Sequence, residues 1–224
     1  MSINLTPRLL AVASLVKGGG IIADIGTDHG YLPIYLIQTG RVNGAIAADI
    51  GKMPLENARK SVAEYCLENK IELRLSDGLR EFKETDACEI VFAGMGGTLI
   101  AEKMAETQWV KNKSLHFIFQ PQSRAEDLRR FLFENGFEIC TELSTHEGRR
   151  HYITFDAVYT GETKDFDDAD CFIGKLPHNE DSHNHISQQV SRLQKKLDAF
   201  EKLGNKETDD LRRTIDKMQR FLND

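Results

Sequence analysis

The stretch from residue 21 to residue 33 constrains the fold more than any other part of the chain. It reads I-I-A-D-I-G-T-D-H-G-Y-L-P. The apolar run from residue 21 to residue 25 is typical of a parallel strand that is covered on both faces. Gly26 permits a tight turn, and Thr27 or Asp28 is placed to cap a following helix. A strand that enters a helix in this way leaves free N–H groups beside a crevice, so an α/β fold with a ligand site is predicted.

Two classes of nucleotide cofactor use such a turn, and the side chains separate them. A dinucleotide site has the pattern G-x-G-x-x-G, with the pyrophosphate at the helix N-terminus. This chain has only Gly26 and Gly30, and the carboxylates of Asp24 and Asp28 would repel a pyrophosphate. The spacing of Asp24, Gly26 and Gly30 resembles the first motif of class I S-adenosylmethionine (SAM) methyltransferases, whose ligand is cationic. An ordinary strand-to-helix turn is the structural alternative.

Composition indicates a globular chain with one main domain. The chain has 224 residues, of which 40% are hydrophobic and 29% charged, enough for a sizeable core. No run approaches the roughly 20 apolar residues of a membrane helix. Thr6 and Pro7 predict a capped first helix, and we expect a cytoplasmic protein. The net charge of −6 argues against indiscriminate coating of nucleic acid, although a local basic patch can still dock one.

The spacing of cysteine and histidine predicts neither disulfides nor a metal site. The four cysteines form no C-x-x-C pair and are expected to be reduced thiols of the core: Cys66, Cys88, Cys140 and Cys171. His178, His183 and His185 are close in sequence, but no carboxylate or thiol is spaced to complete a metal site.

The second and third predicted strands also end in acids. The strand over Gly44–Ile50 ends with Asp49, which is placed to accept hydrogen bonds from both hydroxyls of a ribose. Capping the helix predicted over Pro54–Cys66 is the alternative role. After the third strand, Ile71–Leu75, Asp77 and the following glycine are expected to reach an adenine ring, although such D-G turns are common.

The fourth and fifth predicted strands lead into unusual loops. Glu89–Ala93 is followed by three glycines within Gly94–Gly97, which are costly to order unless backbone must approach something closely. Leu115–Phe119 is followed by Gln120 and Gln122, whose amides can hold the edge of a base. We therefore expect cofactor and acceptor base here; close packing of a helix and a capped turn are the alternatives.

The rest of the chain is predicted to close the sheet and add a helical appendage. A helix over Ser123–Asn135 precedes an antiparallel strand pair over Phe137–Leu143 and His151–Tyr159. Lys164–Ser182 is acidic and is expected to be an irregular connector. The apolar residues beyond it follow a 4-3-4-3 spacing on both sides of a break at Gly204 and Asn205, which predicts an antiparallel helical hairpin with a coiled-coil seam: Ile186, Val190, Leu193, Leu197, Phe200, Leu211, Ile215, Met218 and Leu222.

Together these motifs resemble the bacterial tRNA (adenine(22)-N1)-methyltransferase family. The matching strings are A-D-I-G-T-D-H-G-Y-L-P, A-I-A-A-D ending at Asp49, S-D-G-L from Ser76, A-G-M-G-G-T-L-I from Ala93, and Q-P-Q after the fifth strand. The resemblance extends over nearly the whole chain. It departs from the family at Asp49, which is often Glu, and at Gln122, which is often Asn.

The resemblance implies a class I methyltransferase fold and a reaction. The fold is a Rossmann-like, doubly wound, mostly parallel seven-stranded sheet with a C-terminal helical hairpin. Residues 1–163 would form the SAM-dependent methyltransferase domain, 164–184 a connector, and 185–224 a hairpin that binds tRNA. The reaction is transfer of a methyl group from S-adenosyl-L-methionine to ring N1 of adenine 22 in tRNA.

The resemblance also implies which residues form the site. The cofactor-binding residues are Asp24, Gly26, Thr27, Asp28, His29, Gly30, Tyr31, Leu32, Asp49, Ile50, Asp77, Gly78, Ala93, Gly94, Met95, Gly96 and Gly97. Ring N1 already has a lone pair, so alignment is the main requirement. Asp28 is expected to stabilise the cationic product ring, His29 to orient its neighbours, Gln120 and Gln122 to hold the base, and Asp24 to bind the methionine ammonium.

Basic residues are the candidates for tRNA docking, together with the hairpin: Arg8, Arg124, Arg129, Arg130, Arg149 and Arg150. From His185 onward the chain has nine basic and seven acidic residues, which also suits a solvated coiled-coil face. The other functions considered are a methyltransferase for another RNA or a small molecule, a non-catalytic RNA-binding module and, least favoured, a nicotinamide-dependent oxidoreductase. No membrane, metal or obligate protein partner is expected.

Overall fold

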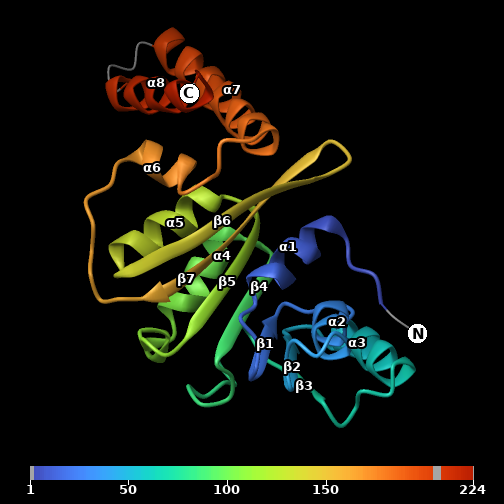
Figure 1. The fold of residues 1–224 in the computed structure, drawn as a ribbon. Helices are drawn as coiled ribbons and strands as arrows, with labels where there is room; N and C mark the ends of the chain where they lie inside the picture. The colour runs from blue at the N-terminus through green and yellow to red at the C-terminus, as the bar shows by residue number, and fades with distance from the viewer. Residues whose placement is uncertain (1–2, 204–207, 224) are drawn as a thin grey trace.

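A seven-stranded sheet of order β3-β2-β1-β4-β5-β7-β6 forms the centre of the molecule (Figure 1). The structure, a computed structural model, describes residues 3–203 and 208–223. Strands β1 to β5 run parallel, and β7 lies antiparallel to both β5 and β6. The elements are α1 (Pro7–Leu15), β1 (Ile21–Ile25), α2 (Tyr31–Gln38), β2 (Gly44–Asp49), α3 (Lys52–Glu64), β3 (Ile71–Leu75), β4 (Glu89–Gly96), α4 (Gly97–Ala105), η1 (Gln108–Val110), β5 (His116–Ser123), α5 (Ala125–Glu134), β6 (Phe137–Glu147), β7 (Arg150–Tyr159), α6 (Asp168–Ile173), α7 (Glu180–Lys202) and α8 (Asp209–Asn223).

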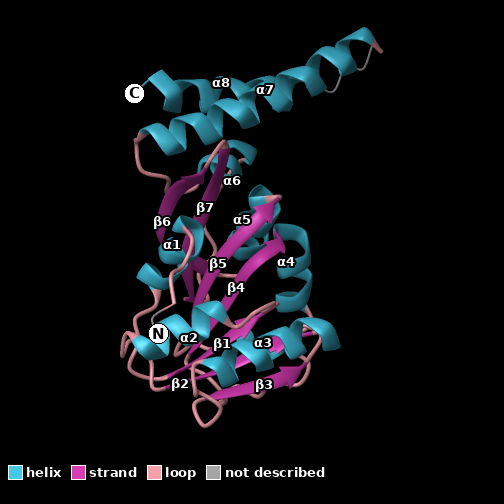
Figure 2. Ribbon diagram, turned by 90° about the vertical axis from the view of Figure 1, so that its right-hand side faces the viewer, coloured by secondary structure: helices cyan, strands magenta, loops and turns pink. Residues whose placement is uncertain are grey.

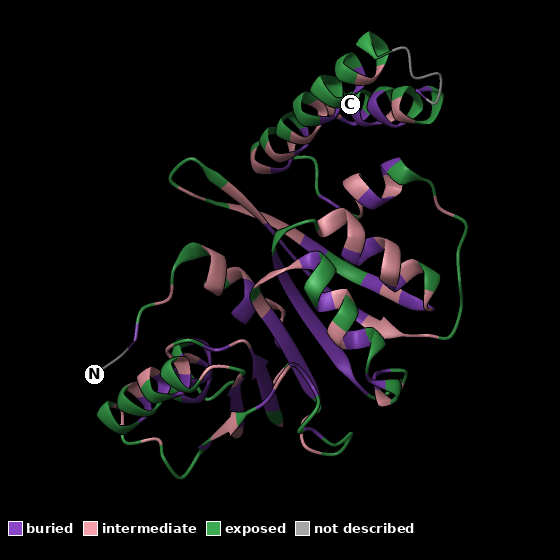
Figure 3. Ribbon diagram, turned by 180° about the vertical axis from the view of Figure 1, so that it is seen from behind, coloured by how far each residue is buried: buried purple, intermediate pink, exposed green. Residues whose placement is uncertain are grey.

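Alternate residues of the parallel strands face two separate cores, because strand side chains point to opposite faces. On one face, Ile22 and Ala47 pack with residues of α1, α2 and α3. On the other, Ala23 and Phe92 pack with residues of α4 and α5. Figure 3 shows the central strands in purple between these two layers of helices. Burial on both faces explains why these strands read as continuous apolar runs, as predicted.

The first three strands have the predicted positions, but β4 and β5 are longer than predicted. β4 continues to Gly96 and β5 to Ser123, because the two extensions pair with each other: Ala93 lies opposite Gln120, and Met95 lies opposite Pro121 after a register shift. Residues 94–96 and the Q-P-Q segment are therefore strand ends rather than loops, which corrects the prediction, and Gly97 begins α4.

The segment between the sheet and the C-terminal helices is more ordered than predicted. Within it lies α6, which begins with a capping box between Asp167 and Asp170. Helix α7 begins at Glu180, capped by the side chain of Asn179. The prediction of an irregular connector is wrong for these parts, since Asp and Asn side chains read as loop residues also cap helices.

The C-terminal helices α7 and α8 lie side by side above the sheet (Figure 2), as predicted. Their buried seam contains Ile186, Leu193, Leu197, Ile215 and Met218, and it also includes Phe221, which the spacing missed. The other predicted seam residues are half-buried: Val190, Phe200, Leu211 and Leu222. The predicted break at Gly204 and Asn205 lies outside the described residues.

The cysteines differ from the prediction. Cys171 is buried, but the other three are exposed, so they are not core thiols: Cys66, Cys88 and Cys140. Over the parts of the chain that the structure describes, no helix has the length and apolar content to cross a membrane.

Candidate functional site

The turn after β1 is fastened to the neighbouring strand β2. The N–H groups of Gly26 and Thr27 both donate to the carbonyl of Ala48, at 2.8 and 2.9 Å. Gly30, at φ 68°, occupies the N-cap position of α2, and its N–H donates to Thr27 Oγ1 at 3.2 Å. Thr27 and Asp28 are therefore not the cap residues that the sequence predicted. Instead, Thr27 braces the turn that carries the predicted motif.

A cavity of about 300 Å³ opens beside this turn, at the carboxyl ends of β1 and β4. In α/β sheets, ligands bind in the crevice at this edge. Most of the predicted cofactor residues of the turn line the cavity, joined by residues from the first helix and the ends of β4 and β5: Arg8, Leu9, Asp24, Gly26, Thr27, Asp28, His29, Gly30, Tyr31, Leu32, Ala93, Gly94 and Gln122.

Three acids near the cavity act on one another. Asp24 is only 6% exposed, and burial raises its pKa to about 6, with Asp49 adding to the rise and Thr27 opposing it. Burial also raises the pKa of Asp49, to which Asp28 contributes, against the hydrogen bond from the Gly51 N–H at 2.6 Å. Within residues 3–203 and 208–223, no ion pair reaches Asp24. The arrangement therefore favours a ligand that brings positive charge.

Asp28 and His29 lie at the rim. His29 Nε2 is 3.3 Å from Asp28 Oδ2, and its ring stacks on Tyr31 with the centroids 5.0 Å apart. The exposed carboxylate of Asp28 also accepts a long hydrogen bond from Asn57 at 3.5 Å. Both side chains thus line the cavity from the turn.

The predicted cofactor residues that follow β2 and β3 are not among those that line this cavity. Ile50, directly after Asp49, is 68% exposed, and Met53 on α3 is 71% exposed. Asp77 pairs with Lys103 at 2.8 Å, and this bond lowers the pKa of Asp77. Gly78 lies against the same lysine, since a Cβ there would come within 2.7 Å of its side chain. The exposed apolar side chains of Ile50 and Met53 suit contact with a flat ring such as adenine. Asp77 already has Lys103 as a cationic partner.

The glycines at the end of β4 have different surroundings. Gly94, at φ 85°, faces the cavity, and a Cβ there would lie 3.8 Å from Arg8 Nη1. A Cβ on Gly97 would come within 2.2 Å of the Arg124 carbonyl, so this glycine is required for packing. Met95 contacts the turn, since its Sδ lies 3.0 Å from where a Cβ of Gly26 would be.

Arg8, a predicted tRNA-docking residue, lines the cavity. Its Nη1 donates to Gln120 Oε1 at 2.6 Å, its backbone N–H donates to Glu147, and its guanidinium lies 5.8 Å from the ring centroid of Tyr152. Gln120 is fully buried, so its amide does not face the cavity as predicted, whereas Gln122 does. No local pattern signals these contacts, because the partners lie more than 100 residues away in the chain.

The predicted basic cluster is divided by the structure. Arg129 is 1% exposed and makes a two-pronged ion pair with Glu142, at 2.9 and 3.0 Å, so its prediction as a surface RNA-binding residue is wrong. Arg124 and Arg130 reach the surface but are paired with acids, Asp127 and Asp168 respectively. Arg149 and Arg150 are exposed at the β6–β7 turn. These residues therefore do not form one continuous basic patch.

The known proteins to which this chain is similar include methyltransferases. The family described as "Methyltransferase domain" matches residues 5–155. The chain is 32% identical to the tRNA (adenine(22)-N(1))-methyltransferase of Bacillus subtilis over 71% of this chain and 70% of that protein. It is similar to a candidate tRNA (m1A22) methyltransferase of Streptococcus pneumoniae in complex with S-adenosyl-L-methionine, with a TM-score of 0.84 and 30% identity over 98% of this chain and all of that one. It is also similar to M. capricolum TrmK in complex with S-adenosyl-homocysteine, with a TM-score of 0.77 and 25% identity over 98% of both chains.

Proposed function

Because this chain belongs to the tRNA (adenine(22)-N1)-methyltransferase family, we propose that it transfers a methyl group from S-adenosyl-L-methionine to ring N1 of adenine 22 in tRNA. The observation that carries the proposal is the buried carboxyl of Asp24. It faces a cavity in which none of the described side chains neutralises it, and Asp49 and Asp28 add to the negative potential. A ligand with an ammonium and a sulfonium would complete the site, whereas a pyrophosphate would be repelled.

The residues present fit each part of such a ligand. Asp24 would bind the ammonium, and the turn from Gly26 to Gly30 would receive the adjacent atoms, because the backbone comes close there without side chains. Asp49 would accept hydrogen bonds from the ribose hydroxyls. Ile50 would cover the adenine, with Asp77 near its amino group while remaining paired with Lys103. When bound, the ligand supplies an electrophilic methyl group on sulfur.

The acceptor side of the cavity needs alignment rather than a strong base. Gly94 and Gln122 line it, and the space beside the glycine allows a flat base to approach. Ring N1 carries its own lone pair, so holding it in line with the methyl group supplies most of the catalysis. The ring becomes cationic, and Asp28 is the exposed carboxylate placed to stabilise it. Arg8, fixed by Gln120, would position the base or its phosphate.

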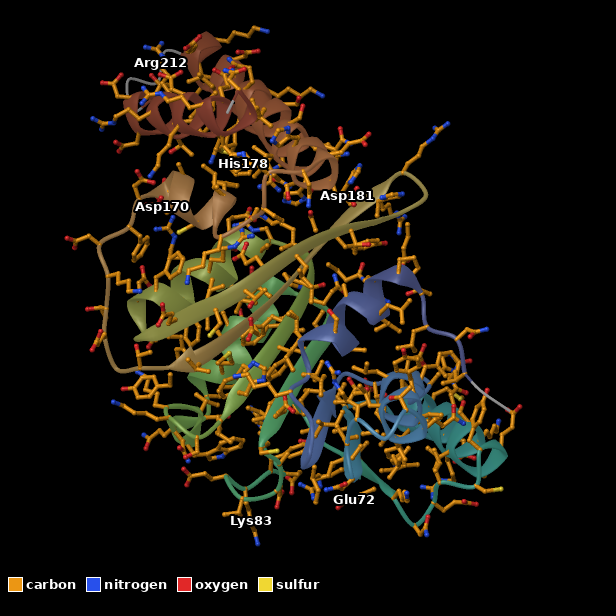
Figure 4. All side chains as sticks on the ribbon, viewed as in Figure 1. Glu72, Lys83, Asp170, His178, Asp181 and Arg212 are labelled. Carbon is orange, nitrogen blue, oxygen red and sulfur yellow. The ribbon has the colours of Figure 1, made fainter. Side chains whose placement is uncertain are left out.

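We assign the tRNA contacts to arginines of the β6–β7 turn and of the start of α5, together with the C-terminal helices. Arg149 and Arg150 are exposed at the β6–β7 turn. Asp181 of α7, labelled in Figure 4, is hydrogen-bonded to His146 of β6 at 2.9 Å, and His151 Nδ1 of β7 lies 3.3 Å from the same carboxylate. Arg124 and Arg130 lie near α7 and α6. Residues 1–163 would then perform the reaction, while the hairpin from residue 185 orients the tRNA.

Turnover on defined tRNA transcripts tests the proposal. Labelled S-adenosyl-L-methionine is incubated with the protein and a transcript that carries either adenine or guanine at position 22, and the nucleosides are identified by mass spectrometry. The expected product is 1-methyladenosine, formed only from the first transcript. Methylation of both transcripts, or of neither, would reject the assignment of the acceptor.

A further inference from the structure

A second cavity, of about 260 Å³, lies between the end of β5, the start of α5 and the inner side of α7. Gln122 lines both this cavity and the one that contains Asp24. The two cavities are therefore neighbours that share the side chain of Gln122 in their linings. The cavity lies just below the size of about 300–1,000 Å³ that is usual for small-molecule pockets, so it suits a single planar group.

The lining of the second cavity combines paired charged side chains with neutral hydrogen-bonding groups and rings. Gln188 and Gln189 of α7 contribute amides, and Tyr152 and Phe172 contribute aromatic rings. The Oε1 atom of Gln189 is buried and has no hydrogen-bond partner among the described residues. A buried acceptor without a partner costs about 1–3 kcal/mol, so it marks a place where a donor from a ligand is missing. Amides and rings together match the edge and the face of a nucleobase.

The second cavity differs from the first in the charges that line it. Its arginines are already paired: Arg124 with Asp127, Arg129 with Glu142, and Arg192 with Glu126. Burial lowers the pKa of His185 to about 3, with the nearby arginines adding to the effect, so this imidazole is neutral at pH 7. A base that becomes cationic would be unfavourable here, whereas the carboxylates of the first cavity favour it. The second cavity therefore suits a base that is not methylated.

We propose that the second cavity binds the nucleobase of an RNA nucleotide directly adjacent to the methyl acceptor. The inference rests on the proposed function for the identity of the ligand as RNA. Gln189 would accept a hydrogen bond from the edge of this base, and Gln122 would stand between it and the acceptor. Holding the neighbouring base in this way would fix the acceptor in the first cavity.

Binding of abasic RNA to defined variants tests this proposal. Three fluorescent tRNA transcripts are compared: one intact, one without the base at position 21 and one without the base at position 23. For the wild-type protein, removal of one of these bases is expected to weaken binding roughly tenfold, as for the loss of a stacked base. The Gln189→Met variant should bind the intact transcript roughly tenfold more weakly than the wild type does. Removing the same base from the transcript should weaken the binding of this variant little further.

A stability measurement and two further variants complete the test. Gln189→Met removes no hydrogen bond found among residues 3–203 and 208–223, so thermal unfolding should match the wild type. Gln188→Met changes an exposed lining residue and gives a second variant. Gln108→Met, in the exposed η1 turn, is the matched control and should bind all three transcripts like the wild type.

Two results would overturn the proposal. One is wild-type protein that binds the abasic and intact transcripts equally. The other is Gln189→Met that either binds the intact transcript normally or loses as much as the wild type at each abasic position. Turnover is scored separately on the intact transcript: discrimination among the RNAs without methylation rejects the proposed function alone, and methylation without discrimination rejects the second base site alone.

Discussion

The buried carboxylate of Asp24 lowers the stability of the fold at neutral pH but is expected to favour binding of a cationic ligand. Its carboxyl is 6% exposed and has a pKa of about 6, above the usual 3.8, because burial disfavours the charged form. An acid with a raised pKa contributes its full stability below pH 3.8 and loses it as the pH rises through about 6. At neutral pH the folded protein therefore carries a cost, which a cationic ligand would offset.

Asp24→Asn should accordingly stabilise the protein and weaken its cofactor binding. Removing the buried charge is expected to relieve about 2–3 kcal/mol at pH 7.5, which corresponds to a rise of roughly 4–10 °C in the unfolding midpoint. Loss of the charged hydrogen-bond partner should weaken binding of S-adenosyl-L-methionine about 10- to 100-fold. Scanning calorimetry and titration calorimetry measure the two effects. A variant that is less stable and binds normally would show that Asp24 is structural.

Binding of the cofactor should also depend on pH through the same group. Below about pH 6, Asp24 is protonated in the free protein, so affinity should fall by up to about tenfold for each further pH unit. Titrations between pH 5 and pH 7.5 measure this slope for the wild type and for Asp24→Asn. Equal slopes for the two proteins would assign the pH dependence to another group.

At the scale of elements, a buried histidine joins three strands. His116 on β5 lies between Glu89 of β4 and Asp156 of β7, with its ring nitrogens 2.7 and 2.8 Å from their carboxylates. Burial alone would lower the pKa of His116, but the two carboxylates raise it overall. Sequence patterns predicted all three strands but not this link, because it depends on which strands become neighbours.

Stability should therefore decline at alkaline pH. A histidine with a raised pKa contributes its full stability below about pH 6.5, its unfolded value, and loses it as the pH rises through the folded value. His116→Gln removes the cation that lies between two buried acids, so we expect a loss of about 3–5 kcal/mol at pH 6. Urea unfolding at pH 6 and pH 9 measures both effects.

His146→Gln is the control for this measurement, since His146 is exposed and its pair with Asp181 is worth little. It should unfold like the wild type at both values of pH. An equal loss for both variants, or a His116→Gln variant as stable as the wild type, would contradict the role of the buried histidine.

At the scale of the whole molecule, the site combines segments that are distant in sequence. The turn after β1 was predictable because strand, glycines and acids are contiguous in the chain. The contacts of Arg8 with Gln120 and Tyr152 and the second cavity were not predictable, since they depend on how α1, β7 and α7 dock onto the sheet. The burial of Arg129 was not predictable either, because its partner Glu142 lies on another element, β6.

The salt dependence of tRNA binding tests the proposed docking surface. Removing a side chain that binds one phosphate should reduce the slope of log affinity against log salt by roughly 0.7–0.9. Arg149→Ala and Arg150→Ala are each expected to produce this change. Lys83→Ala is the control, because Lys83 lies at the opposite end of the molecule from α7 and α8 (Figure 4). Unchanged slopes for both arginine variants would place the tRNA elsewhere.

Carboxylates around the first cavity should select a cationic methyl donor over a pyrophosphate coenzyme. Titration calorimetry of the unmodified protein with S-adenosyl-L-methionine, S-adenosyl-homocysteine and NAD⁺ measures this selectivity. We expect saturable binding of the first two compounds and none of the third. Saturable binding of NAD⁺, with no uptake of either sulfur compound, would contradict it.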